Sequence, residues 1–533
     1  MIFHGEAMKN KKRIPAYYWR RASQLVCLAL FFFLFIRTDY SGRDEIEYAV
    51  NILFRIDPLL ALSASVAAGF FIVLMLPAVV TLLLTLILGR FFCGWVCPMG
   101  TLLDGCHTMA SPQGQGRERK YRFLKFYLLG FLLVGAWFGL PLAGYVDPFS
   151  ILVRSLALAV DPALNALATT FFTYTYEQAP AWVNGLTEPL YTFLKATILP
   201  FNQKYYDLTV LSLVILLVVF LLERLERRFF CRNICPLGAL FAVTARFSLL
   251  RGRAGTKCGT CRNCRDVCRM GAIDEERNIS PLDCNLCLDC IHHCPGNKIS
   301  FQFGGLHKNR PTFALSRRSF VGSLALGAAL PFFLKSRTLA RQADPLLIRP
   351  PGALSEEEFI GRCVRCGECM KVCIGNGLQP AFLQGGLEGM FSPVLKARTG
   401  YCEYNCTLCG QVCPSGAIRK LALEEKQKVK IGNACFDRNR CLPYAKGIPC
   451  MVCEEHCPTP DKAIKFREVV VENSRGEKVS VKQPYLVDEL CVGCGICETK
   501  CPLPGVSAVM VTSAGESRNP AQALPDTGNT GYP

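Results

Sequence analysis

The sequence lacks the residues that would hold a haem or a nicotinamide cofactor. It contains six histidines, and none lies in an expected membrane span, which excludes a transmembrane haem held by two histidines. No C-x2-C-H motif occurs, which excludes a covalently attached c-type haem. No glycine-rich nucleotide fingerprint precedes a helix pattern, so NADH is not the expected electron donor. The histidines are His4, His107, His292, His293, His307 and His456.

Acidic residues are few relative to basic ones, and the imbalance follows a pattern. Lysine and arginine number 60 against 42 aspartates and glutamates, a net charge of +18. Basic residues gather in 1–21, after the second apolar segment and after the fourth, and are scarce in the expected loops 38–65 and 146–205. This positive-inside alternation predicts a membrane unit of four helices with both ends in the cytoplasm, and argues against a nucleic-acid partner. The expected spans are 22–36, 66–88, 126–145 and 208–222.

The apolar half contains a tandem repeat. Asp57-Pro58 and Asp147-Pro148 each precede a span, which is followed by RFFCGWVCPMGTL in the first copy and RFFCRNICPLGAL in the second. Two copies of one orientation predict a pseudo-two-fold axis along the membrane normal. The aspartates are candidate proton acceptors at the outer end, although Asp-Pro also commonly starts a helix.

Each repeat also ends in a C-x3-C-P motif on the expected inner side. Four thiols brought together by the axis would form an extra redox cluster, a reversible dithiol or a metal site. The alternative is a pair of tight helix ends that require small residues. The four cysteines are Cys93, Cys97, Cys231 and Cys235.

Most of the 31 cysteines stand in six short runs. Four are regular C-x2-C-x2-C-x3-C runs, and those beginning at Cys402 and Cys441 have a longer first gap. This is bacterial ferredoxin spacing, in which three cysteines hold one 4Fe-4S cluster and the fourth ligates its neighbour. Structural zinc prefers paired C-x2-C units spaced further apart. Six 4Fe-4S clusters are therefore predicted, with the runs paired in chain order.

The crossed pairing assigns four ligands to each cluster. In the first region the sets are Cys258, Cys261, Cys264 and Cys294, then Cys284, Cys287, Cys290 and Cys268. In the second region they are Cys363, Cys366, Cys369 and Cys413; Cys402, Cys406, Cys409 and Cys373; Cys441, Cys450, Cys453 and Cys501; and Cys491, Cys494, Cys497 and Cys457. Arg269 stands where a proline usually follows the fourth cysteine.

Between the two cysteine-rich regions lies SRRSFVGSLALGAALPFFLKSR, beginning at Ser316. Two adjacent arginines, Arg317 and Arg318, followed by a short apolar run are typical of a twin-arginine export signal. In mid-chain, this stretch would carry the second region across the membrane and remain as an uncleaved anchor. The alternative is a buried core helix that never crosses.

The expected fold is a membrane α-helical four-helix unit of two tandem repeats, joined to α+β bacterial-type ferredoxin domains. One ferredoxin domain has two clusters and is cytoplasmic, and the other has four and is exported. The expected boundaries are 1–250 for the membrane domain, 251–305 for the first ferredoxin domain, 306–340 for the signal or anchor, 341–360 for a linker, 361–512 for the four-cluster domain and 513–533 for a disordered tail.

These motifs resemble two families of iron–sulfur proteins fused in one chain. Residues 20–300, with four spans, two C-x3-C-P motifs and a ferredoxin pair, resemble NapH, a membrane subunit of a quinol dehydrogenase. The C-terminal part resembles NapG and its methylamine-utilisation relative MauM, through the twin arginines and the strings GYCEYNCTLCGQVCP and PCMVCEEHCP. Family spacing favours Cys441 over Cys435 as a ligand.

The resemblance implies a function as well as a fold. Proteins of this kind oxidise menaquinol or ubiquinol and deliver the electrons to a periplasmic redox enzyme or cytochrome. It implies a multi-pass protein of the bacterial inner membrane with its C-terminal domain in the periplasm. Related membrane ferredoxins serve the assembly or maintenance of a periplasmic metalloenzyme, which is the alternative function. The direction of electron flow, the terminal reductase and the oligomeric state stay open.

Overall fold

The computed structural model describes residues 16–109, 121–200, 202–254, 261–296, 298–304, 315–339, 344–472, 476 and 478–518. The chain divides into two compact units whose segments alternate along the sequence. Unit 1 comprises Met1–Arg37, Val50–Ser155 and Leu211–Phe333, and unit 2 comprises Thr38–Ala49, Leu156–Val210 and Leu334–Pro533. Each cysteine-rich region therefore shares a unit with segments of the apolar N-terminal half.

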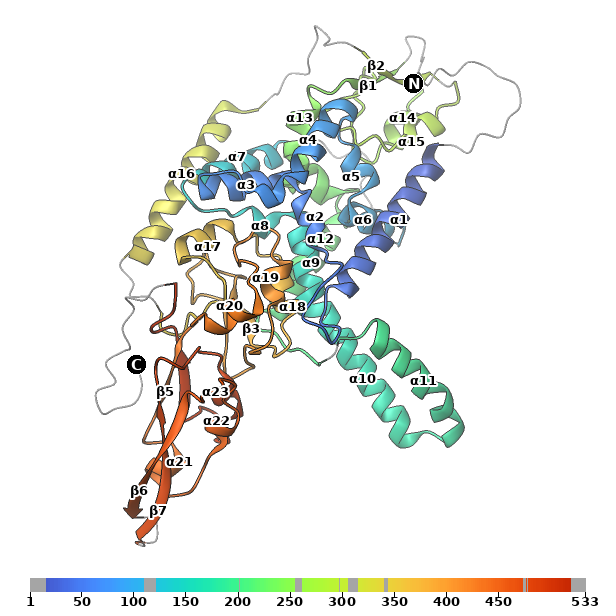
Figure 1. Cartoon of the computed structure of the whole chain (residues 1–533). Helices are drawn as coiled ribbons and strands as arrows, with labels where there is room; N and C mark the ends of the chain where they lie inside the picture. The colour runs from blue at the N-terminus through green and yellow to red at the C-terminus, as the bar shows by residue number, and fades with distance from the viewer. Residues whose placement is uncertain are drawn as a thin grey trace. The chain divides into compact units, whose positions relative to one another are not determined.

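Unit 1 consists mainly of helices (Figure 1). They are α1 (Ala16–Arg37), α2 (Asn51–Arg55), α3 (Pro58–Ala68), α4 (Pro77–Leu88), α5 (Phe91–Trp95), α6 (Pro98–Met109), α7 (Leu124–Trp137), α8 (Ala143–Val146), α9 (Pro148–Ser155), α12 (Thr209–Leu221), α13 (Pro236–Ala245), α14 (Asn263–Asp266), α15 (Asp289–His292) and α16 (Arg317–Leu339).

Two of the four expected spans are not single helices. Between positions 66 and 88 the chain leaves α3 at Gly69, whose φ of 75° is left-handed, and begins α4 at Pro77. Glycine adopts that backbone without a Cβ clash, and proline fixes the first turn of the next helix. In the same way α7 ends at Trp137 and α8 follows only at Ala143. The first and fourth expected spans correspond to α1 and α12.

The stretch 146–205, expected as a loop, is largely helical. The chain is helical from Pro148 to Gln178, through α9, a π-helical turn and α10 (Asp161–Gln178). It returns in α11 (Ala181–Thr197), so that α10 and α11 form a helical hairpin (Figure 1). By length and composition, two helices of the described residues are able to cross a bilayer, Tyr17–Arg37 and Pro148–Gln178. Core helices and signal sequences share these properties.

Short antiparallel sheets accompany the cysteine runs. In unit 1, β1 (Leu250–Ala254) pairs with β2 (Ile299–Phe303). In unit 2, β3 (Leu378–Pro380) pairs with β4 (Pro393–Leu395), β5 (Asn433–Phe436) with β8 (Val509–Thr512), and β6 (Ile464–Glu472) with β7 (Lys478–Leu486). The remaining helices of unit 2 are α17 (Glu356–Arg362), α18 (Glu368–Lys371), α19 (Leu408–Val412), α20 (Leu423–Lys428), α21 (Leu442–Ala445), α22 (Val452–Glu455) and α23 (Ile496–Lys500).

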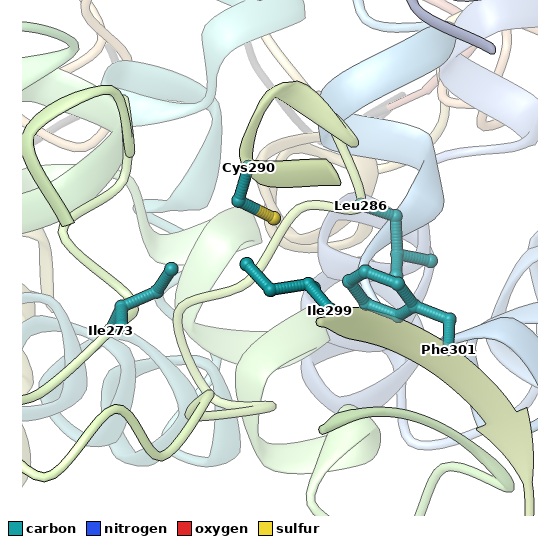
Figure 2. Packing of buried hydrophobic residues seen from close by; sticks show 5 residues of the cluster. All are labelled: Ile273, Leu286, Cys290, Ile299 and Phe301. Atoms are coloured by element: carbon teal, nitrogen blue, oxygen red, sulfur yellow. The ribbon is translucent and has the colours of Figure 1, made fainter. Parts of the chain in front are cut away.

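A small apolar core supports the cysteine runs of unit 1. Its buried members are Ile273, Leu286, Cys290, Ile299 and Phe301. Figure 2 shows the Leu286 side chain beside the Phe301 ring, and the Cys290 sulfur directed toward Ile299. The partly buried cysteines that pack against this core are Cys264, Cys268, Cys284 and Cys294. The core therefore gathers cysteines of both runs around one centre.

The expected linker at 341–360 is part of the folded unit from residue 344 onward. Arg349 is fully buried, and its guanidinium pairs with Glu356, which also pairs with Arg518. Pro350 and Pro351 are buried as well. Proline-rich composition suggested a linker, but here the prolines line a cavity. Of the expected disordered tail, residues 513–518 are ordered on this unit, and 519–533 lie outside the described residues.

Candidate iron–sulfur and thiol sites

Among the described residues of unit 2, four cavities are each lined by four of the predicted ligands. Their empty volumes, which include space open to solvent, are about 410, 350, 370 and 350 Å³. We name each cavity after one of its cysteines. The Cys363 cavity has Cys363, Cys366, Cys369 and Cys413; the Cys373 cavity has Cys373, Cys402, Cys406 and Cys409; the Cys457 cavity has Cys457, Cys491, Cys494 and Cys497; and the Cys441 cavity has Cys441, Cys450, Cys453 and Cys501.

The cavities bring together cysteines from different runs in the crossed pattern. Three cysteines of each cavity come from one run, and the fourth comes from its partner run. Cys441 lines a cavity, whereas Cys435 lies on β5 opposite Met510. Loop conformations that favour glycine shape the runs: Gly367 and Gly495, with φ of 86° and 82°, directly precede α18 and α23.

Backbone amides point at the last cysteine of several runs. Ile418 N donates to Cys413 Sγ at 3.4 Å, and Ala508 N donates to Cys501 Sγ at 3.4 Å. Cys268 Sγ accepts in the same way from Ala272 N at 3.3 Å in unit 1. Hydrogen bonds to sulfur stabilise the thiolate form and tune the potential of a bound cluster. Both cysteine-rich regions therefore share the same local feature, a backbone N–H that donates to the sulfur of the last cysteine in a run.

Zinc sites and 4Fe-4S clusters place different demands on four cysteines. Among the described residues, no three histidine, cysteine, aspartate or glutamate side chains converge closely enough for a metal ion. A structural zinc requires four ligands around one centre, with sulfurs about 2.3 Å from it. A 4Fe-4S cluster instead binds each sulfur at its own iron corner, which keeps the four sulfurs further apart. Four cysteines around one cavity, three of them from a single run, are the donor set that a ferredoxin-type 4Fe-4S cluster uses.

The cysteine runs of unit 1 are described in part. Cys258 lies outside the described residues, and Cys261 is exposed. Cys290 is within electrostatic range of the other three members of its predicted set and of Cys264. Burial and then the nearby Asp289 raise the pKa of Cys287 to about 11. The structure thus brings the second predicted set of this region together.

Arg269, the departure from the usual proline, has a structural role that the sequence did not indicate. Its guanidinium is buried and binds two carboxylates, Asp289 and Asp104, the latter at 2.5 Å. Burial alone would raise the pKa of Asp104, but Arg228 and Arg269 outweigh it and hold the pKa well below its ordinary value. Asp104 belongs to α6, 165 residues away in sequence from Arg269. The spacing of cysteines along the chain does not predict a contact between two residues so far apart in sequence.

The two repeats meet through their arginines. Arg228 donates to the carbonyl oxygens of Cys93 and Gly100, both at 3.0 Å. Arg90 lies in the equivalent position beside Gly238. A Cβ atom on Gly238 would stand 3.0 Å from Arg90 Nη2. The arginine of each R-F-F-C motif therefore reaches the Cys-Pro-x-Gly turn of the other repeat. This reciprocal arrangement is the one that a pseudo-two-fold axis predicts.

The four repeat cysteines gather at this meeting point. Cys97 is within electrostatic range of Cys93 and Cys231, and Cys235 is within range of all three others. Cys97 and Cys235 are buried, and Gly238 N donates to Cys235 Sγ at 3.2 Å. The spans do not continue through the motifs, because Cys97 and Cys235 directly precede the proline-initiated helices α6 and α13.

Both C-x3-C-P motifs pack directly on the cysteine runs of unit 1. Trp95 Nε1 donates to Leu286 O at 3.0 Å. Gly94 approaches the same loop so closely that a Cβ would stand 2.1 Å from Asn285 O. In the second repeat Arg232 lies beside Gly271. A Cβ atom added to Gly271 would stand 2.5 Å from the Arg232 guanidinium. The four thiols and the Cys284 loop therefore belong to one continuous structure.

Asp57 and Asp147 occupy equivalent places, and both are fully buried. Asp57 caps α3, accepting from Leu59 N at 2.8 Å, and Asp147 accepts from Ser150 N at 2.9 Å. The second oxygen of each carboxyl has no donor, and the two carboxyls lie within hydrogen-bonding reach of each other. The helix-start interpretation therefore describes their local role, and the pair forms a carboxyl contact that neither motif alone predicts.

The twin-arginine stretch begins a helix. Arg317 and Arg318 are exposed at the start of α16. Further along, α16 lies against α7: a Cβ on Gly327 would stand 2.6 Å from Phe131 O, and one on Gly130 would stand 3.0 Å from Leu324. Small residues that allow backbones to approach closely are typical of helix pairs within membranes.

Comparisons with known proteins give two kinds of match. The family model of a 4Fe-4S binding domain matches residues 69–107 and 207–257, each of which contains one C-x3-C-P motif. The methylamine utilization ferredoxin-type protein MauM of Methylorubrum extorquens is 34% identical over 203 residues, which are 37% of this chain and 86% of that protein. The ferredoxin-type protein NapG of Escherichia coli K12 is 36% identical over 188 residues, 35% of this chain and 78% of that protein. No solved structure matches the chain.

Proposed function

Because the chain belongs to the family of ferredoxin-type proteins that includes MauM and NapG, it is an iron–sulfur electron-transfer protein, and we propose that it oxidises quinol in a membrane. The electrons leave through the four-cluster domain to a redox enzyme or cytochrome. The observation that carries this proposal is the set of four cavities in unit 2, each lined by four cysteines in the crossed pattern.

The cysteines of each cavity are the proposed ligands of one 4Fe-4S cluster. The crossed sets of unit 1, including Cys258, hold two more, which gives six clusters in the chain. A bound 4Fe-4S cluster exchanges one electron at a time, at a potential that net charge, hydrogen bonds to sulfur and exposure determine. The backbone amides at Cys413, Cys501 and Cys268 supply such hydrogen bonds.

The proposed placement is two-sided, in the inner membrane of a bacterium. Basic segments such as 90–125 share unit 1 with the ferredoxin pair, where Lys125 and Arg122 bind Asp283. The poorly basic segments 38–49 and 156–210 share unit 2 with the four-cluster region. The remainder of the two poorly basic stretches, 50–65 and 146–155, belongs to unit 1, so the division into units supports this placement in part. In this arrangement α16 is an uncleaved anchor, and its close approach to α7 supports that role.

Quinol loses two electrons and two protons when it becomes quinone. We assign the electrons to the gathered thiols of the repeats, which would hold a further redox cluster or metal, or directly to the outer clusters. The match of a 4Fe-4S binding family to both C-x3-C-P segments supports the first assignment. The carboxyl pair of Asp57 and Asp147 is the proposed acceptor of one proton, since two buried carboxyls in contact favour sharing one, and the second proton is released to water.

The test is anaerobic mixing of the purified protein with a short-chain quinol while the iron–sulfur absorbance is followed. We expect bleaching within seconds, because the clusters are the acceptors. Protein that dithionite bleaches and quinol does not would instead act as an assembly or maintenance factor. Cys97→Ser together with Cys235→Ser is expected to abolish quinol-driven bleaching and leave dithionite bleaching of the six ferredoxin clusters intact. Unchanged quinol oxidation in this variant would reduce the four cysteines to a structural role.

A further inference from the structure

Two short segments from the N-terminal half form part of the four-cluster unit. Segments 38–49 and 156–210 belong to unit 2, together with everything described from residue 344 onward. Their contacts with the cysteine runs come from residues more than 160 positions away in sequence, which makes them tertiary contacts. They fall on the loops that carry the cysteines of the Cys363 and Cys373 cavities.

The first contact is a buried charged triad. Asp39 Oδ1 accepts from Lys204 Nζ at 2.9 Å, and Asp39 Oδ2 lies 3.6 Å from Lys371 Nζ. Lys371 also donates to Thr38 O at 3.0 Å. Lys204 and Lys371 have 4% and 2% of their side chains exposed, and Asp39 has 12%. Lys371 stands between Cys369 and Cys373, which line different cavities, so the triad holds the loop that joins the two.

A second contact lies on the run that begins at Cys402. Thr407 stands between Cys406 and Cys409 and donates to Asp44 with both its amide and its hydroxyl, each at 2.7 Å. Gln411 donates to Asp44 O at 2.7 Å and accepts from Ile46 N at 3.2 Å. The segment 38–49 therefore binds a cysteine run through hydrogen bonds of both its main chain and its side chains.

The third contact comes from segment 156–210. Tyr206 donates its hydroxyl to Met370 O at 2.9 Å. Tyr205 O accepts from Asn376 Nδ2 at 3.1 Å and from Gln379 Nε2 at 3.0 Å. Both segments thus hold the same pair of cavities.

The cavities also have an order. The Cys363 and Cys373 cavities exchange their fourth cysteines, and so do the Cys457 and Cys441 cavities. The two pairs of cavities are connected where Cys402 N donates to Cys494 O at 2.8 Å, because Cys402 lines the Cys373 cavity and Cys494 lines the Cys457 cavity. The chain of sites therefore runs from Cys363 through Cys373 and Cys457 to Cys441.

From this arrangement we infer that the Cys363 and Cys373 sites receive electrons first, and that electrons then pass through the Cys402–Cys494 contact to the Cys457 and Cys441 sites. The inference rests on the proposed function. In the sequence, segments 38–49 and 156–210 directly follow the apolar helices α1 and α9, so the Cys363 and Cys373 sites are held by the segments that are covalently joined to those helices. Each step moves one electron, which oxidises the donor site and reduces the next.

The test uses full-length protein in detergent, a short-chain quinol as reductant, rapid freezing and electron paramagnetic resonance. Asp44→Ala removes the carboxylate that binds Thr407 without touching a proposed ligand. We expect quinol-driven reduction of the unit 2 clusters to slow at least about tenfold, while iron content and dithionite reduction stay at wild-type values. Glu468→Ala, on the exposed strand β6, is the matched control and is expected to reduce at the wild-type rate.

A second variant tests the order of the sites. Cys494→Ser at the junction is expected to leave the Cys363 and Cys373 sites reducible by quinol, and to stop reduction of the Cys441 site. Wild-type rates at the Cys441 site in Cys494→Ser, or at all sites in Asp44→Ala, would overturn the inference and leave quinol oxidation standing. A wild-type protein that quinol does not reduce would overturn the proposed function itself, and the inference with it.

Discussion

Arg269 occupies a place where the ferredoxin spacing leads one to expect proline. Its two carboxylate partners, Asp104 and Asp289, are themselves largely buried. Arg269→Ala would leave both charges without their partner, which costs about 3–5 kcal/mol for a buried pair. We expect this loss in the free energy of unfolding, measured from thermal bleaching of the iron–sulfur absorbance. Arg265→Ala, whose partner Glu275 is exposed, is the control and is expected to cost about 0–1 kcal/mol.

The paired aspartates allow capping to be separated from proton transfer. Asparagine caps a helix about as well as aspartate does but cannot take up a proton. Asp57→Asn is therefore expected to keep the fold and to slow quinol oxidation at least about tenfold. Asp57→Leu removes the cap as well and is expected to lose about 1–2 kcal/mol of stability. Wild-type quinol oxidation in Asp57→Asn, measured by the bleaching rate, would leave the pair with capping alone.

For single residues, the sequence predicts which cysteines group together better than it predicts contacts between side chains that are distant in sequence. Regular spacing determines which three cysteines share a loop, and exchange of the fourth follows from the ferredoxin pattern; the cavities of unit 2 bring these sets together. Local spacing does not predict two other contacts, because they form only when distant parts of the chain fold together. These are the Arg269–Asp104 ion pair and the contact between Asp57 and Asp147. The assignment of ligands stays a prediction until metal is measured.

Single elements deviate from the sequence prediction where backbone geometry outweighs hydropathy. Average hydropathy over 66–88 is insensitive to a single glycine in the left-handed conformation, so the sequence predicts one helix there, although α3 ends at Ala68, just before Gly69. The sequence does not predict the helices α10 and α11, because the feature that stands out in 146–205 is its small number of basic residues. Charge distribution indicates the side of a membrane, and it carries no information on secondary structure.

The contact of α16 with α7 gives a prediction for one element. Gly327→Leu would force a side chain into Phe131 O and is expected to cost about 1–3 kcal/mol, as overpacking does. Gly322→Leu, on the same helix with open space around its Cβ position, is the control and is expected to be neutral. Resistance to limited proteolysis between α16 and residue 344 reports the effect. Equal resistance in both variants would argue against α16 as a packed anchor.

The whole chain folds as two units whose segments alternate along the sequence, and each unit contains one of the two cysteine-rich regions. Chain order alone gives no hint that 38–49 and 156–210 would fold with the C-terminal region. Positive-inside counting separated these segments from the basic ones, but only tertiary contacts such as Asp44 with Thr407 connect them to a cysteine run.

The two-sided placement is tested with reporters. A reporter inserted after Ser300 is expected to be cytoplasmic, and one after Glu516 periplasmic, because α16 carries the second region across. Changing Arg317 and Arg318 to lysine is expected to keep the second reporter inside, since the export route reads the arginine pair. A cytoplasmic reporter after Glu516 in the unaltered chain would contradict the two-sided arrangement and place all clusters on one face.

We propose that six cysteine sets of this chain hold 4Fe-4S clusters for electron transfer, and the metal content of anaerobically purified protein decides whether they do. We expect about 24 iron atoms per chain, four for each cluster, with equal acid-labile sulfide and little zinc. A further cluster at the four repeat cysteines would raise the count by about four. Protein that contains mainly zinc, or iron near eight atoms per chain, would contradict it.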